Sequence, residues 1–197
     1  MTTPVFEVEM QQGADFNATV NWYGGGVFRG PIEEIDPGYP TKVRVSAHGL
    51  PSSSDTPVII SGVQGAEILN SVDRGIELCT RVDADYFTVP ISTVPCEWVV
   101  GTGEITFHQP SNLAGFTARC ALRSKPYSGS IIHTFTTENS GIVLDANDGS
   151  ILLTTTAAVT AGLLFGRAYG DVELISGAGL VTRVFRIEVP FSRETTK

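Results

Sequence analysis

The stretch Phe16-Asn-Ala-Thr-Val-Asn-Trp22 alternates apolar and polar residues with a period of two, the pattern of a β-strand with one buried face. Four further stretches repeat the pattern, with apolar sets at Val43, Val45 and Ala47; Ile76, Leu78 and Val82; Phe116, Ala118, Cys120 and Leu122; and Phe185, Ile187 and Val189. Turn-forming sequences such as Pro37-Gly38 and Asn147-Asp-Gly149 separate them. We therefore predict an all-β protein whose antiparallel sheets close into a β-sandwich or barrel.

One stretch, Thr154 to Leu164, has a helical pattern, and it is short and rich in Thr and Val. The chain of 197 residues has a formal net charge of −8, which argues against nucleic acid as a partner because such binding needs clustered Lys and Arg. Residues 1–12 hold no apolar run, and no later stretch is long and apolar enough to span a bilayer. We expect no signal peptide, no membrane partner and synthesis in the cytoplasm.

The composition suggests that one module is interrupted by another. Residues 31–40 contain three acids followed by Pro-Gly and Tyr-Pro, which is typical of an exposed crossover, and residues 109–112 offer a second break. We predict a discontinuous outer β-sandwich module of residues 1–37 and 109–197 and an inserted small β-barrel of residues 38–108. The predicted core of the insert is Val43, Val45, Val58, Ile60, Ile68, Leu69, Ile76, Leu78, Phe87, Trp98 and Val100.

The three cysteines, Cys79, Cys96 and Cys120, are odd in number and lack Cys-x-x-Cys spacing, so we expect buried free thiols and neither a disulfide framework nor a zinc site. His48, His108 and His133 have no partner at metal-ligand spacing, and we expect structural roles for them.

Two loop motifs have simpler explanations than ligand binding. Gly24–Gly30 lacks the Lys-Ser/Thr of a phosphate loop and is expected to be a flexible turn. Asp145–Gly149 resembles half a calcium loop but lacks the closing Glu, which favours a hairpin turn. We predict no catalytic, cofactor-binding or metal-binding residue.

The stretches Gly115-Phe-Thr-Ala-Arg-Cys-Ala-Leu-Arg123, Tyr169-Gly-Asp-Val-Glu-Leu174 and Gly179-Leu-Val-Thr-Arg-Val-Phe-Arg-Ile-Glu-Val189 carry a family resemblance. Together with Phe6–Trp22 they resemble a module of tailed-phage baseplate proteins, best known as the N-terminal domain of the upper baseplate protein. The insert, through Ala47-His-Gly-Leu50 and Val58-Ile-Ile-Ser-Gly-Val63, resembles a small β-barrel of phage virion proteins. That barrel is related in fold to the first catalytic-cysteine half-domain of ubiquitin-activating enzymes, which implies no ubiquitin chemistry.

The resemblance implies a non-enzymatic structural component of a phage virion, assembled in the host cytoplasm. We expect a tail-tip, baseplate or tail-fibre adaptor protein that contacts other tail proteins, and fibres among them, as a homo-oligomer. Residues 1–5 and 191–197 are candidate arms for such contacts.

Other functions stay open as alternatives. A head-to-tail connector or capsid decoration protein would have the same composition. A carbohydrate-binding module could use Tyr23, Tyr86 and Trp98 as platforms, although packing explains them equally. A glycan hydrolase would need paired carboxylates, and the clustered acids Glu33, Glu34 and Asp36 lie in the expected linker.

Overall fold

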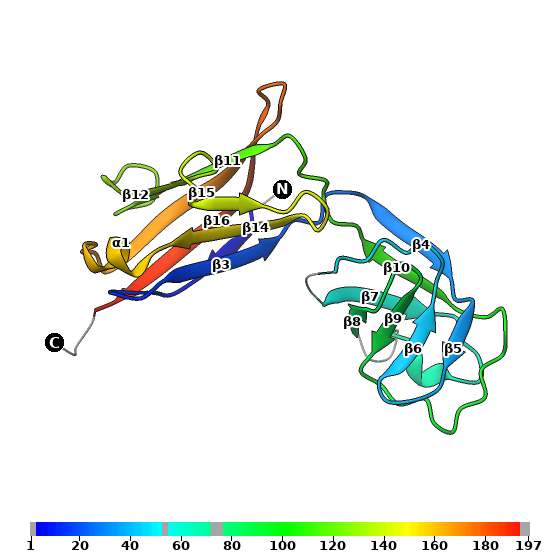
Figure 1. Cartoon of the computed structure of the whole chain (residues 1–197). Helices are drawn as coiled ribbons and strands as arrows, with labels where there is room; N and C mark the ends of the chain where they lie inside the picture. Colours follow the sequence, from blue (N-terminus) through cyan, green and yellow to red (C-terminus); the bar gives the residue numbers. More distant parts are fainter. Residues whose placement is uncertain (1–2, 53–54, 72–76, 194–197) are drawn as a thin grey trace. The chain divides into compact units, whose positions relative to one another are not determined.

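The computed structural model describes residues 3–52, 55–71 and 77–193 and divides the chain into two compact units (Figure 1). Unit 1 comprises Met1–Trp22 and Leu113–Lys197, and unit 2 comprises Tyr23–Asn112. The regular secondary structure of both units is almost entirely β-strand, which confirms the predicted all-β class. No helix in the described part of the chain is long and apolar enough to cross a membrane.

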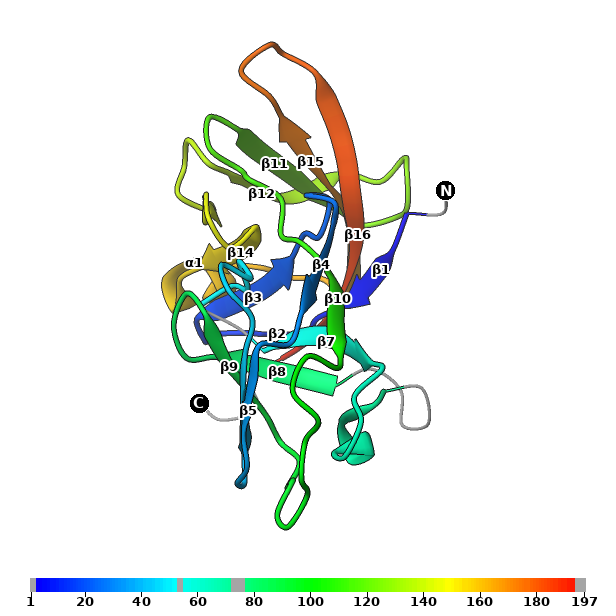
Figure 2. The same ribbon diagram turned by 90° about the vertical axis from the view of Figure 1, so that its right-hand side faces the viewer.

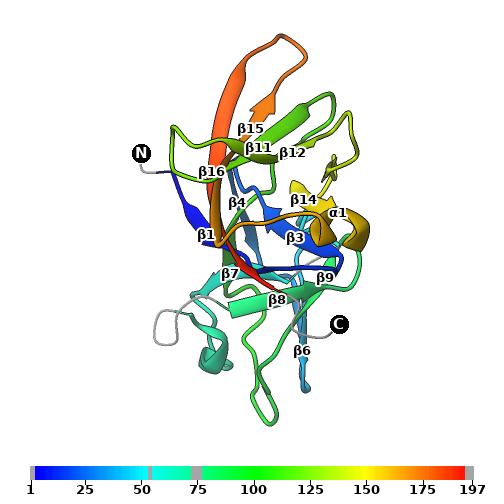
Figure 3. The ribbon, with the colours of Figure 1, turned by 90° about the vertical axis from the view of Figure 1, so that its left-hand side faces the viewer.

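Unit 1 is a sandwich of two sheets. Among the described residues, the larger sheet contains β1 (Val5–Glu7), β2 (Met10–Gln11), β11 (Thr117–Arg123), β12 (Ile131–Thr136), β15 (Arg167–Ile175) and β16 (Val181–Ser192), with the main order β1-β16-β15-β11-β12. The smaller sheet, in the order β13-β14-β3, contains β3 (Phe16–Asn21), β13 (Ile142–Leu144) and β14 (Ser150–Thr155). Figure 3 shows β16 running along unit 1 with β1 beside it.

The core of unit 1 lies between these sheets because alternate residues of each strand point inward. Phe16 and Ala18 from the smaller sheet share one apolar cluster with Cys120 and Leu122 of β11 and with Phe185 of β16. Most of the buried positions predicted for these three strands are therefore confirmed, while Val20, Trp22 and Phe116 are only partly buried against the cluster. Val184, predicted to face outward, is also buried, and it lies where the β15–β16 register shifts at a bulge.

The helix predicted from Thr154 to Leu164 is mostly wrong. Thr154 and Thr155 end strand β14, where they pair with Asn17 and Phe16. A single turn of helix, α1 (Ala157–Ala161), follows. β-Branched threonines gain more from pairing on a pleated sheet than from a helix, because the branch stiffens the side chain.

The expected terminal arms are partly sheet instead. Val5 belongs to β1, which pairs in parallel with β16, and Phe191 and Ser192 end β16, where they pair with β2. Of the other predicted arm residues, 3, 4 and 193 have no regular secondary structure, and 1–2 and 194–197 lie outside the described residues.

Unit 2 is one curled sheet, a half-barrel (Figure 2). Its strands run in the order β4-β10-β7-β8-β9-β6-β5 over the described residues. They are β4 (Val27–Pro31), β5 (Glu34–Asp36), β6 (Thr41–Arg44), β7 (Thr56–Ser61), β8 (Glu77–Arg81), β9 (Tyr86–Val89) and β10 (Glu104–His108), with a 3-10 turn η1 (Glu67–Leu69) after β7. The sheet curls because β4 pairs with β10, while β5, a few residues on, pairs with β6 at the opposite end.

The boundaries of the units differ from the predicted ones. Residues 31–40 are no free linker: Ile35 is buried opposite Val43, and the N–H of Ile32 donates to the Gly103 carbonyl. Residues 23–37 therefore belong to unit 2, because their backbone groups complete its sheet.

The predicted register of β8 is wrong. Leu78 and Val82 are more than half exposed, whereas Cys79 is fully buried opposite Thr56; Ile76 lies outside the described residues. Because strand side chains alternate, burying Cys79 turns its neighbour Leu78 to solvent. Two other expected core residues are also exposed, Ile68 and Val100, while Val43, Val58, Ile60 and Phe87 form the core of unit 2.

Candidate functional site

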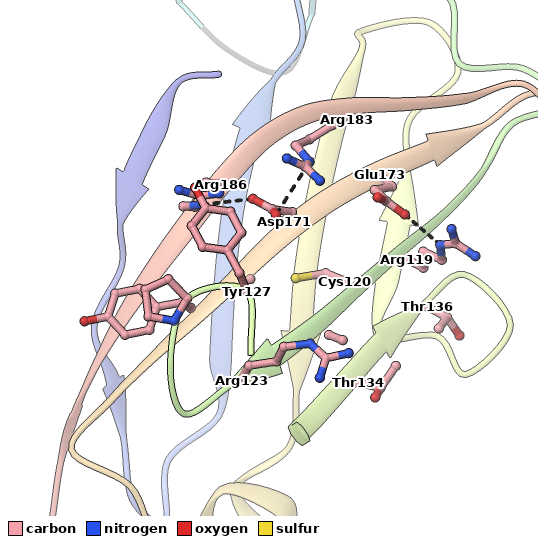
Figure 4. A pocket seen from close by; sticks show the side chains of 14 residues that line it. Arg119, Cys120, Arg123, Tyr127, Thr134, Thr136, Asp171, Glu173, Arg183 and Arg186 are labelled. Atoms are coloured by element: carbon pink, nitrogen blue, oxygen red, sulfur yellow. Dashed lines mark hydrogen bonds and ion pairs between the residues drawn. The ribbon is translucent and has the colours of Figure 1, made fainter. Parts of the chain in front are cut away.

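A groove of about 450 Å³ lies on unit 1, on the face of the larger sheet that points away from the core (Figure 4). Its walls come from β11, β12, β15 and β16, and the β11–β12 loop borders it through Pro126 and Tyr127. Four arginines line it: Arg119, Arg123, Arg183 and Arg186. Thus strands distant in sequence build one polar surface.

Strand alternation places these arginines in the groove. On β11, Ala118, Cys120 and Leu122 are buried in the core, so Arg119 and Arg123 face the opposite way. Gly170 on β15 permits the close packing underneath, because a Cβ at this position would lie 2.6 Å from the Cys120 Sγ. The surface of the groove therefore depends on the packing of the core beneath it.

The strand register alternates charges across the face. Arg119 on β11 lies opposite Glu173 on β15, which in turn lies opposite Arg183 on β16. Nε of Arg119 donates to Oε2 of Glu173 at 2.8 Å, as the dashed line in Figure 4 marks. In the next row, Oδ1 of Asp171 accepts a hydrogen bond from Nε of Arg186 at 2.9 Å. The other oxygen of Asp171, Oδ2, lies 3.5 Å from Nε of Arg183. The central strand thus carries the acids and the flanking strands the arginines.

The β11–β12 loop is fixed over this face by two of the arginines. Nη1 of Arg123 donates to the Gly129 carbonyl at 3.0 Å. The Arg186 guanidinium stacks on the Tyr127 ring, 4.7 Å from its centroid, while that tyrosine is 76% exposed. Hydrogen bonds that Arg186 makes to Asp171 and, with a smaller effect, to Tyr127 raise the pKa of its guanidinium, so it remains cationic.

The groove has a surplus of positive charge. Four arginines face Asp171 and Glu173, a local balance of 4 − 2 = +2 in a chain whose total is −8. Each guanidinium has five N–H donors, and the bonds above use only part of them. Such a surface can bind a carboxylate or another oxyanion through paired hydrogen bonds.

The groove contains one cysteine, Cys120, and its side chain is buried. Burial raises the pKa of the Cys120 thiol to about 12, and it does the same for Cys79 in unit 2. Both are free and buried as predicted, whereas Cys96 is free but only half-buried. The described residues include no group of three or more His, Cys, Asp or Glu that could hold a metal ion.

None of the three histidines is among the residues that line the groove. His48 is fully buried in unit 2, where its Nδ1 accepts the Leu50 N–H at 3.0 Å and its ring packs edge-on against Phe87. Burial lowers the pKa of His48, with the Tyr86 carbonyl opposing the shift, and burial also lowers the pKa of His133. His108 ends strand β10 and is exposed.

One of the two loop motifs is the expected turn. Asp145 Oδ1 accepts the N–H groups of Asn147 and Asp148, which builds the predicted β13–β14 hairpin turn. The flexible turn expected at Gly24–Gly30 is largely wrong, because residues 27–30 belong to strand β4 and pair with β10. The residues before it are constrained as well: Gly25 donates its N–H to the Gln109 carbonyl, and a Cβ there would overlap the Pro110 carbonyl oxygen.

The clustered acids are part of the unit 2 sheet. Glu33 accepts the Ser46 hydroxyl at 2.9 Å and Glu34 accepts the Tyr86 hydroxyl at 3.0 Å. Asp36 lies opposite Lys42 on the neighbouring strand.

The proposed aromatic platforms are also occupied within unit 2. The Tyr86 ring carries the Lys42 ammonium at 4.1 Å, and the Trp98 indole donates to the Thr102 carbonyl while packing on the core. Tyr23 lies at the start of unit 2 and is half-buried. In their place, Tyr127 and Tyr169 line the groove of unit 1.

Sequence reasoning missed the groove arginines. The available signal was their spacing, since Arg119 and Arg123 both occupy outward positions of one predicted strand, as Arg186 does on another. Arg183 has the inward parity of Phe185 and reaches the outer face only through the register shift between β15 and β16. No protein-family model matches this chain, and no curated protein matches its sequence.

Proposed function

We propose that this chain is a non-catalytic structural component of a tailed-phage virion, a tail-tip, baseplate or tail-fibre adaptor protein that acts through protein–protein contacts. The observation that carries the proposal is the β15–β16 hairpin, whose strands of nine and twelve residues are the longest described. Its loop projects beyond the sheet, as Figures 1, 2 and 3 all show. At the tip Leu180 is 70% exposed and Val181 is 45% exposed.

A projecting hairpin with an apolar tip supports assembly because a partner gains stability by burying such side chains. Complete burial of one leucine contributes about 1.5 to 3 kcal/mol. Scattered surface apolar residues need no such explanation, but here two adjacent ones occupy the end of a rigid ribbon. The resemblance of both units to phage virion modules supports the same function and supplies its setting.

The arginine groove adds a second contact surface on unit 1. Stable assemblies commonly combine an apolar anchor with polar contacts around it, and charged grooves add specificity. A head-to-tail connector or a capsid decoration protein would use the same two contact surfaces, but at another position in the particle.

A carbohydrate-binding module is the second candidate. Tyr127 favours it, because this exposed aromatic ring lies beside polar groups of the groove. One face of the ring is already stacked on Arg186.

Immunogold electron microscopy of intact and disrupted phage particles, with antibody raised against this chain, tests the proposal. Label at the tail tip is the expected result. Label on the head or neck would favour the connector or decoration alternative, and unlabelled particles would contradict a virion role.

A further inference from the structure

We propose that the arginine groove of unit 1 binds the carboxylates of an extended, acidic protein segment. The inference rests on the proposed function for the source of that segment, a neighbouring virion protein. Its chemistry rests on the groove alone.

The charge balance defines the ligand as an anion. Arg119 and Arg183 each have one ion pair and side chains about half exposed, 56% and 46%. Their remaining N–H donors therefore meet solvent in the groove. All four cations are arginines, whose planar forks match the two oxygens of a carboxylate better than a lysine ammonium does.

The acids on β15 favour a patterned ligand over a uniform polyanion. Asp171 and Glu173 lie between the arginine-bearing strands β11 and β16. A chain with a charge on every unit, such as a polyuronate or a nucleic acid, would place negative groups over these carboxylates. In a protein segment, by contrast, acidic residues can stand opposite the arginines while neutral side chains lie over β15.

The spacing of the arginines defines the pattern. Arg119 and Arg123 are four positions apart on β11, which is about 13 Å along a strand. Two acidic residues at positions i and i+4 of an extended segment have the same separation. A segment lying along β11 would thus bring one carboxylate to each of these arginines.

The neighbouring sheet edge favours side-chain contacts over strand addition. Asn139 receives the Thr136 N–H on its side-chain oxygen and donates to the Thr134 carbonyl, both at 2.9 Å. These backbone groups of the edge strand β12 are therefore already bonded, which blocks a partner strand at this point. The exposed Tyr127 ring offers an apolar contact at the groove border instead.

Titration calorimetry with the full chain tests the inference. The probe is a peptide of roughly nine residues, mostly Thr and Ser, with two Glu residues at i and i+4. We expect binding to the chain that weakens about tenfold or more in the Arg119→Gln/Arg123→Gln variant and at high salt. The matched control is a variant with two arginines outside the groove lining replaced, Arg29→Gln/Arg167→Gln, which should bind like the original chain. Thermal melting verifies that both variants fold.

Three outcomes would overturn the inference: no binding of the Glu peptide, equal binding of the same peptide with Gln in place of Glu, or tighter binding of a galacturonate oligosaccharide. The two proposals fail separately. Peptide binding with unlabelled particles would refute the virion role and leave the groove assignment standing, whereas labelled tail tips without peptide binding would refute the groove assignment alone.

Discussion

Unit 1 and unit 2 are both β-structures, yet they use their charged side chains differently. In unit 2, carboxylates hold loops: Asp83 accepts the N–H groups of Asp85 and Tyr86, and Asp85 accepts that of Ala47. In unit 1, Asp145 also holds a turn, but on the outer face of the larger sheet carboxylates pair with arginines across strands, as Glu173 does with Arg119. A carboxylate that caps a turn is saturated locally, whereas an arginine lattice retains donors for a ligand. The comparison explains why unit 1 contains the binding groove.

The largest expected effect is a loss of stability confined to one unit when its core is truncated. Phe185→Ala in unit 1 and Phe87→Ala in unit 2 each remove a fully buried ring. Each should destabilise its own unit by about 3 to 5 kcal/mol, because the lost burial and the cavity add. Differential scanning calorimetry should show one transition lowered by each variant and the other unchanged. Equal lowering of both transitions by either variant would mean that the units do not unfold independently.

The reaction rates of the three thiols with a thiol reagent should distinguish buried cysteines from accessible ones. A thiol pKa of about 12, against 9.0 for the ordinary thiol, makes the thiolate of Cys79 and of Cys120 about a thousandfold rarer. We expect the native chain to react rapidly with a thiol reagent only at half-buried Cys96, and at three sites in denaturant. The Cys96→Ser variant is the control, and rapid native labelling in it would contradict the burial of the other two thiols.

Mild acid should destabilise unit 2 through His48. Burial keeps the pKa of this imidazole below its ordinary value of 6.5 in the folded state, so the unfolded chain binds the additional proton first. The contribution of neutral His48 to the free energy of unfolding should therefore be fully present above pH 6.5, and it should decrease as the pH falls toward the folded-state pKa. His48→Asn keeps an acceptor for the Leu50 N–H and removes the titration, so its unit 2 melting temperature should depend less on pH over this range. An unchanged pH dependence would exclude His48 as the cause. His133 in unit 1, only half-buried, should give a smaller effect of the same sign.

The smallest expected effect concerns the ion pairs of the groove. Arg119→Gln should change the stability of unit 1 by less than about 1 kcal/mol, because the pair with Glu173 is partly exposed and screened by solvent. Chemical denaturation measures this change. A loss of several kcal/mol would mean that the arginine lattice serves mainly to hold the sheet together.

Much of the fold was predictable from local alternation. Phe16 and Ala18, or Cys120 and Leu122, are buried as their period of two indicates, since that period needs no knowledge of the partner strand. The predictions failed where pairing with a neighbouring strand determines which residues are buried or which element forms. Cys79 and Leu78 compete for the inward position of β8, and pairing with β7 selects the cysteine. Thr154 prefers β14 because β3 is there to pair with it.

The groove could not be predicted in the same way. The outward positions of Arg119 and Arg123 follow from the sequence, but their placement beside Asp171 and Arg186 depends on the β11-β15-β16 order. The boundary of unit 2 has the same cause, because residues 31–36 read as a linker until β6 and β10 supply hydrogen-bond partners.

The sequence by itself determined the all-β class, the inward residues of its regular strands, the turn at Asp145–Gly149 and the acidic charge of the chain. Only the tertiary structure decided the strand order, the register of β8, and the gathering of four arginines around two acids. The physical reason is that alternation and turn chemistry act between near neighbours, whereas sheet order brings together residues such as Arg119 and Arg183 that are remote in sequence.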